Sequence, residues 1–281
     1  MHAELSDDIT GKVLMGITIP PCPASLTNIM REAKHPSARI DSLAHLISRD
    51  AGIVAPLLKL ANSPFIGLKS KVTSAFQAVS VLGMQNTLNL VQNIALRQSI
   101  SSASQSFEKF WERSSLTATI AEKVAAKFMA VSKDDAYIAA LFHDCGIPVL
   151  MMKFPEYRKT VMTQCQSGKP LCDVENDSFS TSHATVGHML TRNWMLHDHI
   201  CKAILYHHDT GVFTSMGGEE KTAIRDLVGI IHMAECIADE HLNVKKTEWP
   251  QFEPDVLKHF DMSNQEFSDL KEDILVYLSG G

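Results

Sequence analysis

The sequence lacks several features that would place a protein in a specialised class. Its six cysteines include no Cys-x-x-Cys spacing, so we expect reduced thiols and no disulfide framework. The formal net charge is −6, and the chain has no run of lysine and arginine residues. Nucleic-acid affinity rests mainly on clustered positive charge, so we do not expect the protein to bind nucleic acid. The first ten residues carry acids and no apolar signal core, and no later stretch reaches about 18 uncharged apolar residues. These absences predict a cytoplasmic protein that binds neither nucleic acid nor membranes.

What the chain has is a periodic distribution of apolar residues along 281 positions, 45% of which are hydrophobic. Leu116, Ile120, Val124 and Phe128 are spaced four residues apart, which places them on one face of a helix. No segment alternates with the two-residue period of a strand between hairpin turns. The predicted fold class is therefore all-α, with many helices in two lobes that meet at the serine-rich run 99–106. The clearest predicted helices cover residues 24–33, 85–98, 156–166, 182–194, 197–207, 219–240 and 265–278.

Capping signals mark where several of these helices begin and end. Asp50 can cap a helix that runs to residue 62, and Ser74 with Gln77 has the form of a capping box. Ser132 precedes a helix that leads to His143 and Asp144, after which a glycine and a proline at 146 and 148 predict a break.

The pair His143 and Asp144 lies within the apolar run from Ala139 to Leu150. An imidazole or a carboxylate removed from water costs several kcal/mol unless it is hydrogen-bonded, ion-paired or bound to a metal. Cys145 beside them is a poor candidate for a nucleophile, since sequence neighbours at a helix end rarely align for a hydrogen bond. The pair therefore requires partners from elsewhere in the chain.

Three further histidines, His183, His207 and His208, are candidates for the same interior. Imidazole and carboxylate groups are usual ligands of zinc, iron and manganese, and helical bundles assemble such sites from facing helices. Adjacent helical residues point about 100° apart, so His207 and His208 can share a site only if their helix ends there. The alternative is that these histidines are ordinary core or surface residues.

Several short motifs also follow one another in a fixed order. They are Ile19-Pro-Pro-Cys-Pro23, Ile47-Ser-Arg-Asp50, Leu57-Leu-Lys-Leu-Ala-Asn-Ser63, Phe65-Ile-Gly67, Gln77-Ala-Val79, Leu82-Gly83, Phe110-Trp111 with Ser114, Leu141-Phe-His-Asp-Cys-Gly146, His183-Ala-Thr-Val-Gly187 and His207-His208. Together they resemble the HDOD domains of bacterial signalling proteins, which are relatives of the HD metal-dependent phosphohydrolases. The resemblance implies an HDOD domain over 17–241, with an N-terminal lobe of about 17–100 and an HD-like lobe of about 101–241. A helical extension would follow over 242–281.

The HD hydrolases hold a metal with an upstream histidine, the His-Asp pair and a later aspartate. Carried over by position, the pair is His143-Asp144, the later acid corresponds to Glu235, and the upstream position holds Arg113. A guanidinium has no electron pair for a metal and stays protonated. We therefore hypothesise that Arg113 occupies the former metal position and pairs with Asp144, as a cation in a degenerate site.

Two functions from different classes follow from this resemblance. One is a regulatory module of bacterial signal transduction without a cofactor, whose partners are other signalling proteins and whose oligomeric state the sequence leaves open. The other is a metal-dependent phosphohydrolase of the phosphodiesterase or nucleotidase type, with iron, manganese, zinc or magnesium held by His143, Asp144, His183, His207, His208 and Glu235. In the second case His143 and Asp144 would be catalytic. A third possibility is a helical core whose histidines only satisfy one another.

Overall fold

The computed structural model describes residues 16–62, 71–100, 107–128, 131–165, 169–215, 219–244 and 248–279. Every regular element within these ranges is a helix and none is a strand, which confirms the all-α prediction. The motif at residues 65–67 lies outside them. The chain divides into two compact units, a larger one of Met1–Pro21 and Ser102–Ser263, and a smaller one of Cys22–Ser101 and Asn264–Gly281.

The smaller unit is built from short amphipathic helices with local caps. Asp50 accepts a hydrogen bond from the backbone N–H of Gly52, as predicted. Ser74 accepts one from the N–H of Gln77, but Gln77 reaches back to the N–H of Thr73 and not to that of Ser74 itself. The helices are α2 (Ala24–Ala33), α3 (Ile40–Ser48), α4 (Ala51–Ala61), α5 (Ala75–Leu82), α6 (Met84–Ile100) and α17 (Asn264–Ser279).

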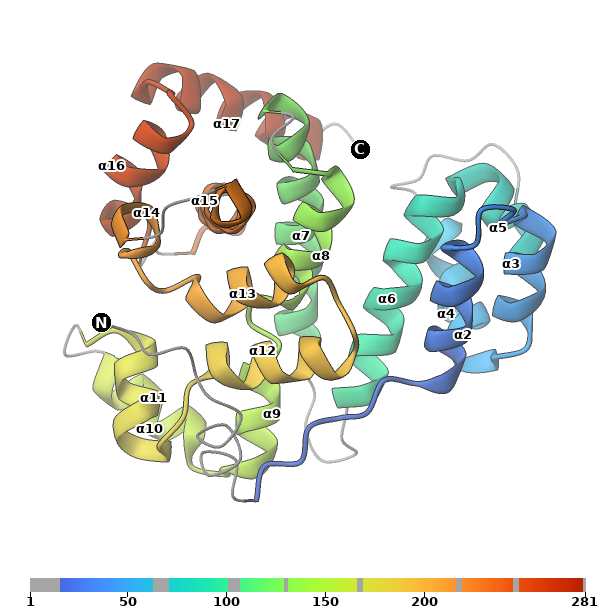
Figure 1. The fold of residues 1–281 in the computed structure, drawn as a ribbon, viewed down its shortest axis with the longest axis horizontal. Helices are drawn as coiled ribbons and strands as arrows, with labels where there is room; N and C mark the ends of the chain where they lie inside the picture. The colour runs from blue at the N-terminus through green and yellow to red at the C-terminus, as the bar shows by residue number, and fades with distance from the viewer. Residues whose placement is uncertain are drawn as a thin grey trace. The chain divides into compact units, whose positions relative to one another are not determined.

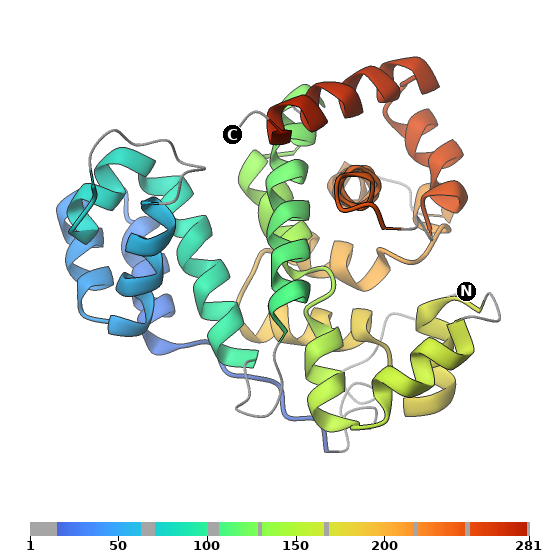
Figure 2. The ribbon, with the colours of Figure 1, turned by 180° about the vertical axis from the view of Figure 1, so that it is seen from behind.

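The larger unit holds the candidate site. Its helices are α7 (Glu108–Phe128), α8 (Lys133–Phe142), α9 (Gly146–Lys153), α10 (Tyr157–Cys165), α11 (Leu171–Phe179), α12 (His183–Asn193), α13 (Asp198–Tyr206), α14 (Val212–Ser215), α15 (Glu219–His241) and α16 (Trp249–His259). Helices α7 and α8 run side by side (Figure 1). Helix α15 packs on α7, α13 and α16 and is seen end-on in both views (Figure 2).

One long apolar stretch among the described residues lies in the core of the larger unit. Lys133–Lys153, which covers α8 and α9, has the length and hydropathy of a membrane span, yet 72% of its most apolar window is buried inside the protein. Along α7, the predicted stripe contributes Ile120 and Val124, which are fully buried. The stretch is therefore core, and it delivers His143 and Asp144 to the interior.

Four helices of the larger unit, α9, α11, α14 and α16, are absent from the sequence prediction. The break predicted by the glycine and proline at 146 and 148 is present, since α8 ends at Phe142 and three turn residues follow, but the chain is helical again from Gly146, where α9 accommodates Pro148 in its first turn without loss of an intrahelical N–H bond. Helices α11 and α16 were not predicted, since neither carries a long i, i+4 apolar stripe. Both prove important for the site.

A surface contact between α8 and α13 gives a first testable prediction. His199 donates a 3.0 Å hydrogen bond to Asp135, which lowers the pKa of that carboxyl against the opposing effect of burial. We expect His199→Ala to raise the pKa of Asp135 toward its ordinary value, as measured by NMR titration. Because the pKa of Asp135 is lower in the folded than in the unfolded state, its contact with His199 stabilises the fold above about pH 4. That stabilisation is lost as the pH falls through the folded-state pKa, so wild type and variant should become equally stable at low pH. The control His241→Ala, at an exposed position, should leave the pKa of Asp135 unchanged. If His199→Ala also leaves it unchanged, the prediction is wrong.

Candidate functional site

The site begins where α8 ends. His143 and Asp144 follow directly after Phe142, and the side chains of His143 and Asp144 are 1% and 14% exposed. The next glycine lets the main chain approach α12: a Cβ at Gly146 would lie 2.1 Å from the carbonyl oxygen of His183. No other residue fits there without a shift of one helix. This contact brings Asp144 next to His183, the first residue of α12.

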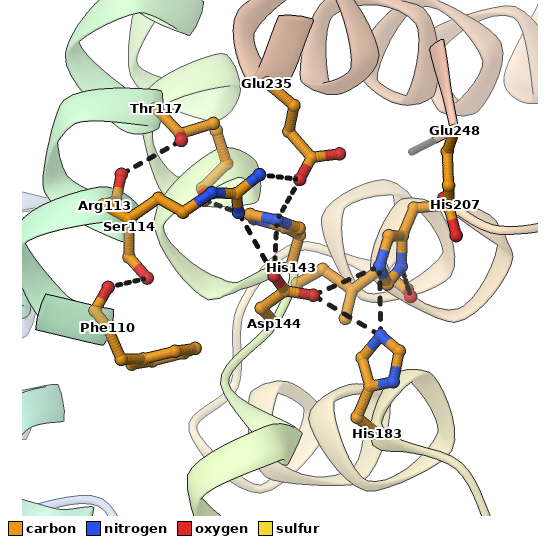
Figure 3. Close-up of polar contacts among 12 residues, drawn as sticks. Phe110, Arg113, Ser114, Thr117, His143, Asp144, His183, His207, Glu235 and Glu248 are labelled. Atoms are coloured by element: carbon orange, nitrogen blue, oxygen red, sulfur yellow. Dashed lines mark hydrogen bonds and ion pairs between the residues drawn. The ribbon is translucent and has the colours of Figure 1, made fainter. Parts of the chain in front are cut away.

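Asp144 stands between two groups of side chains (Figure 3). Its Oδ2 lies 3.1 Å from Nε2 of His143 and 3.6 Å from Nη1 of Arg113. Its Oδ1 lies 3.4 Å from Nε2 of His183 and 3.6 Å from Nε2 of His207. One carboxylate therefore joins a cationic side of the site to a histidine side.

The cationic side is centred on Arg113 of α7. The guanidinium donates to Asp239 from Nε at 3.1 Å and from Nη2 at 2.9 Å, and to Glu235 from Nη2 at 2.9 Å. Glu235 and Asp239 are four residues apart on α15 and so share the face that meets α7. Arg113 is thus paired with three acids, of which Asp144 is the most distant.

His143 is a second cation on this side. Its Nδ1 donates to the carbonyl of Ala140 at 2.7 Å, and its Nε2 faces Asp144 and, at 3.3 Å, Glu235. Burial opposes protonation of this imidazole, but the two carboxylates outweigh it and raise the pKa of His143 to about 10. Burial is likewise outweighed at Glu235, where His143 and Arg113 hold the pKa of the carboxyl well below its usual range. The positive charges of Arg113 and His143 and the negative charges of the neighbouring carboxylates therefore compensate one another within the site.

On the other side, three imidazoles converge. Nε2 of His183 lies 2.8 Å from Nε2 of His208 and 3.4 Å from Nε2 of His207. These atoms and an oxygen of Asp144 all fall within 4.8 Å of one another. His207 and His208 can both contribute because α13 ends at Tyr206, as the sequence argument required.

Each of the three imidazoles is fixed from behind by an acceptor for its Nδ1 proton. His183 donates to Glu175 of α11 at 2.7 Å, His207 donates to the carbonyl of Ile204 at 2.7 Å, and His208 donates to Glu248 at 2.6 Å. A proton on Nδ1 leaves the electron pair of the neutral ring on Nε2. Acceptors of this kind are typical of metal-binding histidines, because they set the tautomer and the ring orientation.

Burial also favours neutral rings for His207 and His208. It lowers the pKa of His207 to about 4 and that of His208 to about 3, with the neighbouring histidines adding to the effect. Both rings are therefore neutral at pH 7, and their Nε2 atoms are available as ligands. Burial would also lower the pKa of His183, but Glu175 outweighs it and raises that pKa. When Nε2 of His183 is protonated, it can donate a hydrogen bond to Nε2 of His208. A divalent cation placed between the four ligand atoms would instead accept an electron pair from each of them.

Four of the six distances between these ligand atoms match those around a metal ion. Metal–nitrogen and metal–oxygen bonds of about 2.0–2.2 Å place neighbouring ligand atoms about 2.8–3.6 Å apart in octahedral or tetrahedral geometry. The distances around His183 and Asp144 run from 2.8 to 3.6 Å. His143, Asp144 and Glu235 form a second group of residue types that bind metals, but His143 is protonated there and the two carboxylates face His143 and Arg113. The histidine side is thus the part of the site that suits a metal.

All seven residues singled out from the sequence lie in this one site. The sequence reasoning missed Glu175 and Tyr157, whose hydroxyl donates to Glu175. It also missed Asp239 and Glu248. Asp239 could have been found, since it lies one turn after Glu235, whereas the others act from neighbouring helices whose packing the sequence pattern does not show. Cys145 is fully buried and burial raises the pKa of its thiol, which argues against a nucleophile.

Comparison with known proteins gives relatives at low identity. An uncharacterized protein of Treponema pallidum (strain Nichols) is 26% identical over 193 residues, which cover 68% of this chain. The chain spans only 38% of the length of that relative.

Among solved structures, a protein of Shewanella amazonensis SB2B provisionally described as a phosphohydrolase matches with a TM-score of 0.74 and 20% identity, over 98% of this chain and 95% of that one. An HDOD domain protein of unknown function from Geobacter sulfurreducens matches with a TM-score of 0.74 and 21% identity, over 96% and 94%. At such identities these structures support the fold alone. The sequence model of the HDOD domain matches residues 19–210, about two thirds of the chain. The protein therefore belongs to the HDOD domain family.

Proposed function

We propose that the protein is a regulatory module of bacterial signal transduction, which acts through other signalling proteins and does not turn over phosphoesters. The observation that carries this proposal is the cationic side of the site. Arg113 and His143 supply two positive charges among the carboxylates of Asp144, Glu235 and Asp239. A guanidinium offers no electron pair, so this side has a permanent cation in place of a metal position.

The proposal retains one metal on the histidine side. His183, His207, His208 and one oxygen of Asp144 would hold it, and a set of three imidazoles and a carboxylate suits zinc, iron or manganese. A divalent metal, when bound, supplies a Lewis acid that can activate water. The residues of this chain orient the ligands through Glu175 and Glu248 and keep the ligand set buried. In this proposal the metal stabilises the arrangement of helices that partners recognise.

A second candidate function is a phosphohydrolase that works with a single metal. The four-ligand cluster favours it, because the same cluster that holds a metal could also present water to a phosphoester. Against it stands the charge of the site. Even with the two charges of a divalent ion added to those of Arg113 and His143, the five carboxylates of Asp144, Glu235, Asp239, Glu175 and Glu248 leave the centre negative, which disfavours an anionic substrate.

Elemental analysis together with a phosphodiesterase and nucleotidase screen distinguishes these candidates. We expect about one equivalent of metal per wild-type chain, loss of that metal in His207→Ala, and no turnover with zinc, manganese, iron or magnesium. The exposed histidine of α3 provides a matched control, since His45→Ala should retain the metal. Turnover by wild type that disappears in Asp144→Asn, in a variant that remains folded, would overturn the proposal in favour of the hydrolase.

A further inference from the structure

Helix α16 lies beyond the segment that matches the family, yet it contacts the histidine cluster from its first residues. Glu248, at the N-terminal end of α16, accepts the 2.6 Å hydrogen bond from Nδ1 of His208. This carboxylate is largely buried, with 23% of its side chain exposed. It is the acceptor that leaves the electron pair of His208 on Nε2, where the other ligand atoms lie.

A second connection runs from α16 to another of the histidines. Phe252, which is 2% exposed, stacks on the ring of His232 with the ring centres 3.7 Å apart and the planes 21° apart. His232 in turn donates from Nε2 to the carbonyl of His207 at 2.6 Å. His232 of α15 therefore contacts both the backbone of His207, a proposed metal ligand, and the side chain of Phe252 on α16.

The far end of α16 contacts α15 and α7 of the larger unit. His259 contacts Asp226 of α15 at 2.6 Å, and Phe260 packs on Phe128 of α7 with ring centres 4.4 Å apart. Neither contact involves the histidine cluster. The helix thus spans from the surface of the unit to the cluster, with the two connections to the ligands near its beginning.

From this arrangement we infer that Glu248 is a positioning residue for the metal ligands, and that metal binding and the docking of α16 stabilise each other. The inference rests on the metal site of the proposed function. If Glu248 leaves the cluster, His208 loses the acceptor that fixes its tautomer, and the affinity for metal falls. By thermodynamic linkage, a bound metal strengthens the docking of α16 by the same factor. Helix α16 then reports the occupancy of the cluster at the surface of the unit.

Zinc titration of the full chain against a chromophoric chelator, combined with hydrogen exchange, tests this coupling. We expect Glu248→Ala to weaken zinc binding about 10- to 100-fold, the usual effect of removing an acceptor behind a metal-binding histidine. Glu248→Gln, which keeps an acceptor oxygen, should recover part of that loss. In wild type, zinc should slow amide exchange in α16 and leave α3 of the smaller unit unchanged, and Glu248→Ala should abolish the effect on α16.

Glu253→Ala is the matched control, because it removes a carboxylate five residues further along the same helix. It should bind zinc as wild type does. If wild type binds zinc and Glu248→Ala binds it equally tightly, the inference is overturned while the metal site of the proposed function stands. If zinc does not alter exchange in α16 of wild type, the coupling is also refuted. If wild type does not bind zinc at all, both the metal site and this inference fall.

Discussion

Replacing Glu175 with alanine should reduce the free energy of unfolding by about 3–5 kcal/mol, as expected when one partner of a buried charged pair is removed. The carboxylate is fully buried and accepts hydrogen bonds from the N–H of His183 at 2.9 Å, from Nδ1 of the same residue at 2.7 Å, and from the hydroxyl of Tyr157. Its loss leaves three buried donors without an acceptor. The affinity for zinc should fall about 10- to 100-fold as well.

Thermal unfolding and zinc titration measure the two effects, and the helix supplies its own control. Asp173→Ala removes an exposed carboxylate from the first turn of α11 and should cost less than about 1 kcal/mol. Glu175→Gln keeps one acceptor oxygen but adds a donor, so its stability should lie between those of wild type and Glu175→Ala. A Glu175→Ala protein as stable as Asp173→Ala would show that this carboxylate does not organise the site.

The second large effect concerns Arg113. We expect Arg113→Met to lower the free energy of unfolding by about 3 kcal/mol, the lower end of the range for breaking a buried ion pair, because 29% of the Arg113 side chain is exposed. Methionine preserves much of the side-chain volume while it removes the guanidinium that pairs with Asp144, Glu235 and Asp239. The loss should grow at low ionic strength, where repulsion between the carboxylates is least screened.

An exposed arginine of the same unit serves as the control for this change. Arg158→Met on α10 should alter stability by less than about 0.5 kcal/mol. Arg113→His tests the role of the fixed cation in a different way, since an imidazole at this position adds an electron pair beside His143, Asp144 and Glu235. Its zinc content should rise from one equivalent toward two. Equal stability of Arg113→Met and wild type, together with one zinc in Arg113→His, would refute the assigned role.

Local signals explain the part of the fold that the sequence predicts well. Asp50, Ser74 and Ser132 accept hydrogen bonds from backbone groups two or three residues away, so the caps can be found from residues that are close in the chain. The stripe along α7 is equally local. The all-α fold class follows from such signals because each depends on a short window of sequence.

The site is predictable only in part for the same reason. The cluster of Asp144, His183, His207 and His208 can be predicted from motifs in a fixed order. The residues behind the ligands cannot, since Glu175 and Glu248 are ordinary glutamates whose roles depend on how α11 and α16 fold back on the histidines. The pairing of Arg113 was predicted with Asp144, whereas the closest acids in the structure are Glu235 and Asp239. Which of several acids an arginine selects is decided by helix packing, not by spacing along the chain.

The main-chain contact at Gly146 has a consequence for how the proposed metal ligands tolerate mutation. The distance between Asp144 and His183 is set by two backbones that touch, one at the start of α9 and one at the start of α12. Any side chain at position 146 would push these helices apart and lengthen the distance between Asp144 and His183. In the proposed metal site, the spacing of the ligand atoms is therefore encoded partly in a residue that has no ligand atom, and we expect a single methyl group there to weaken metal binding with every donor still present.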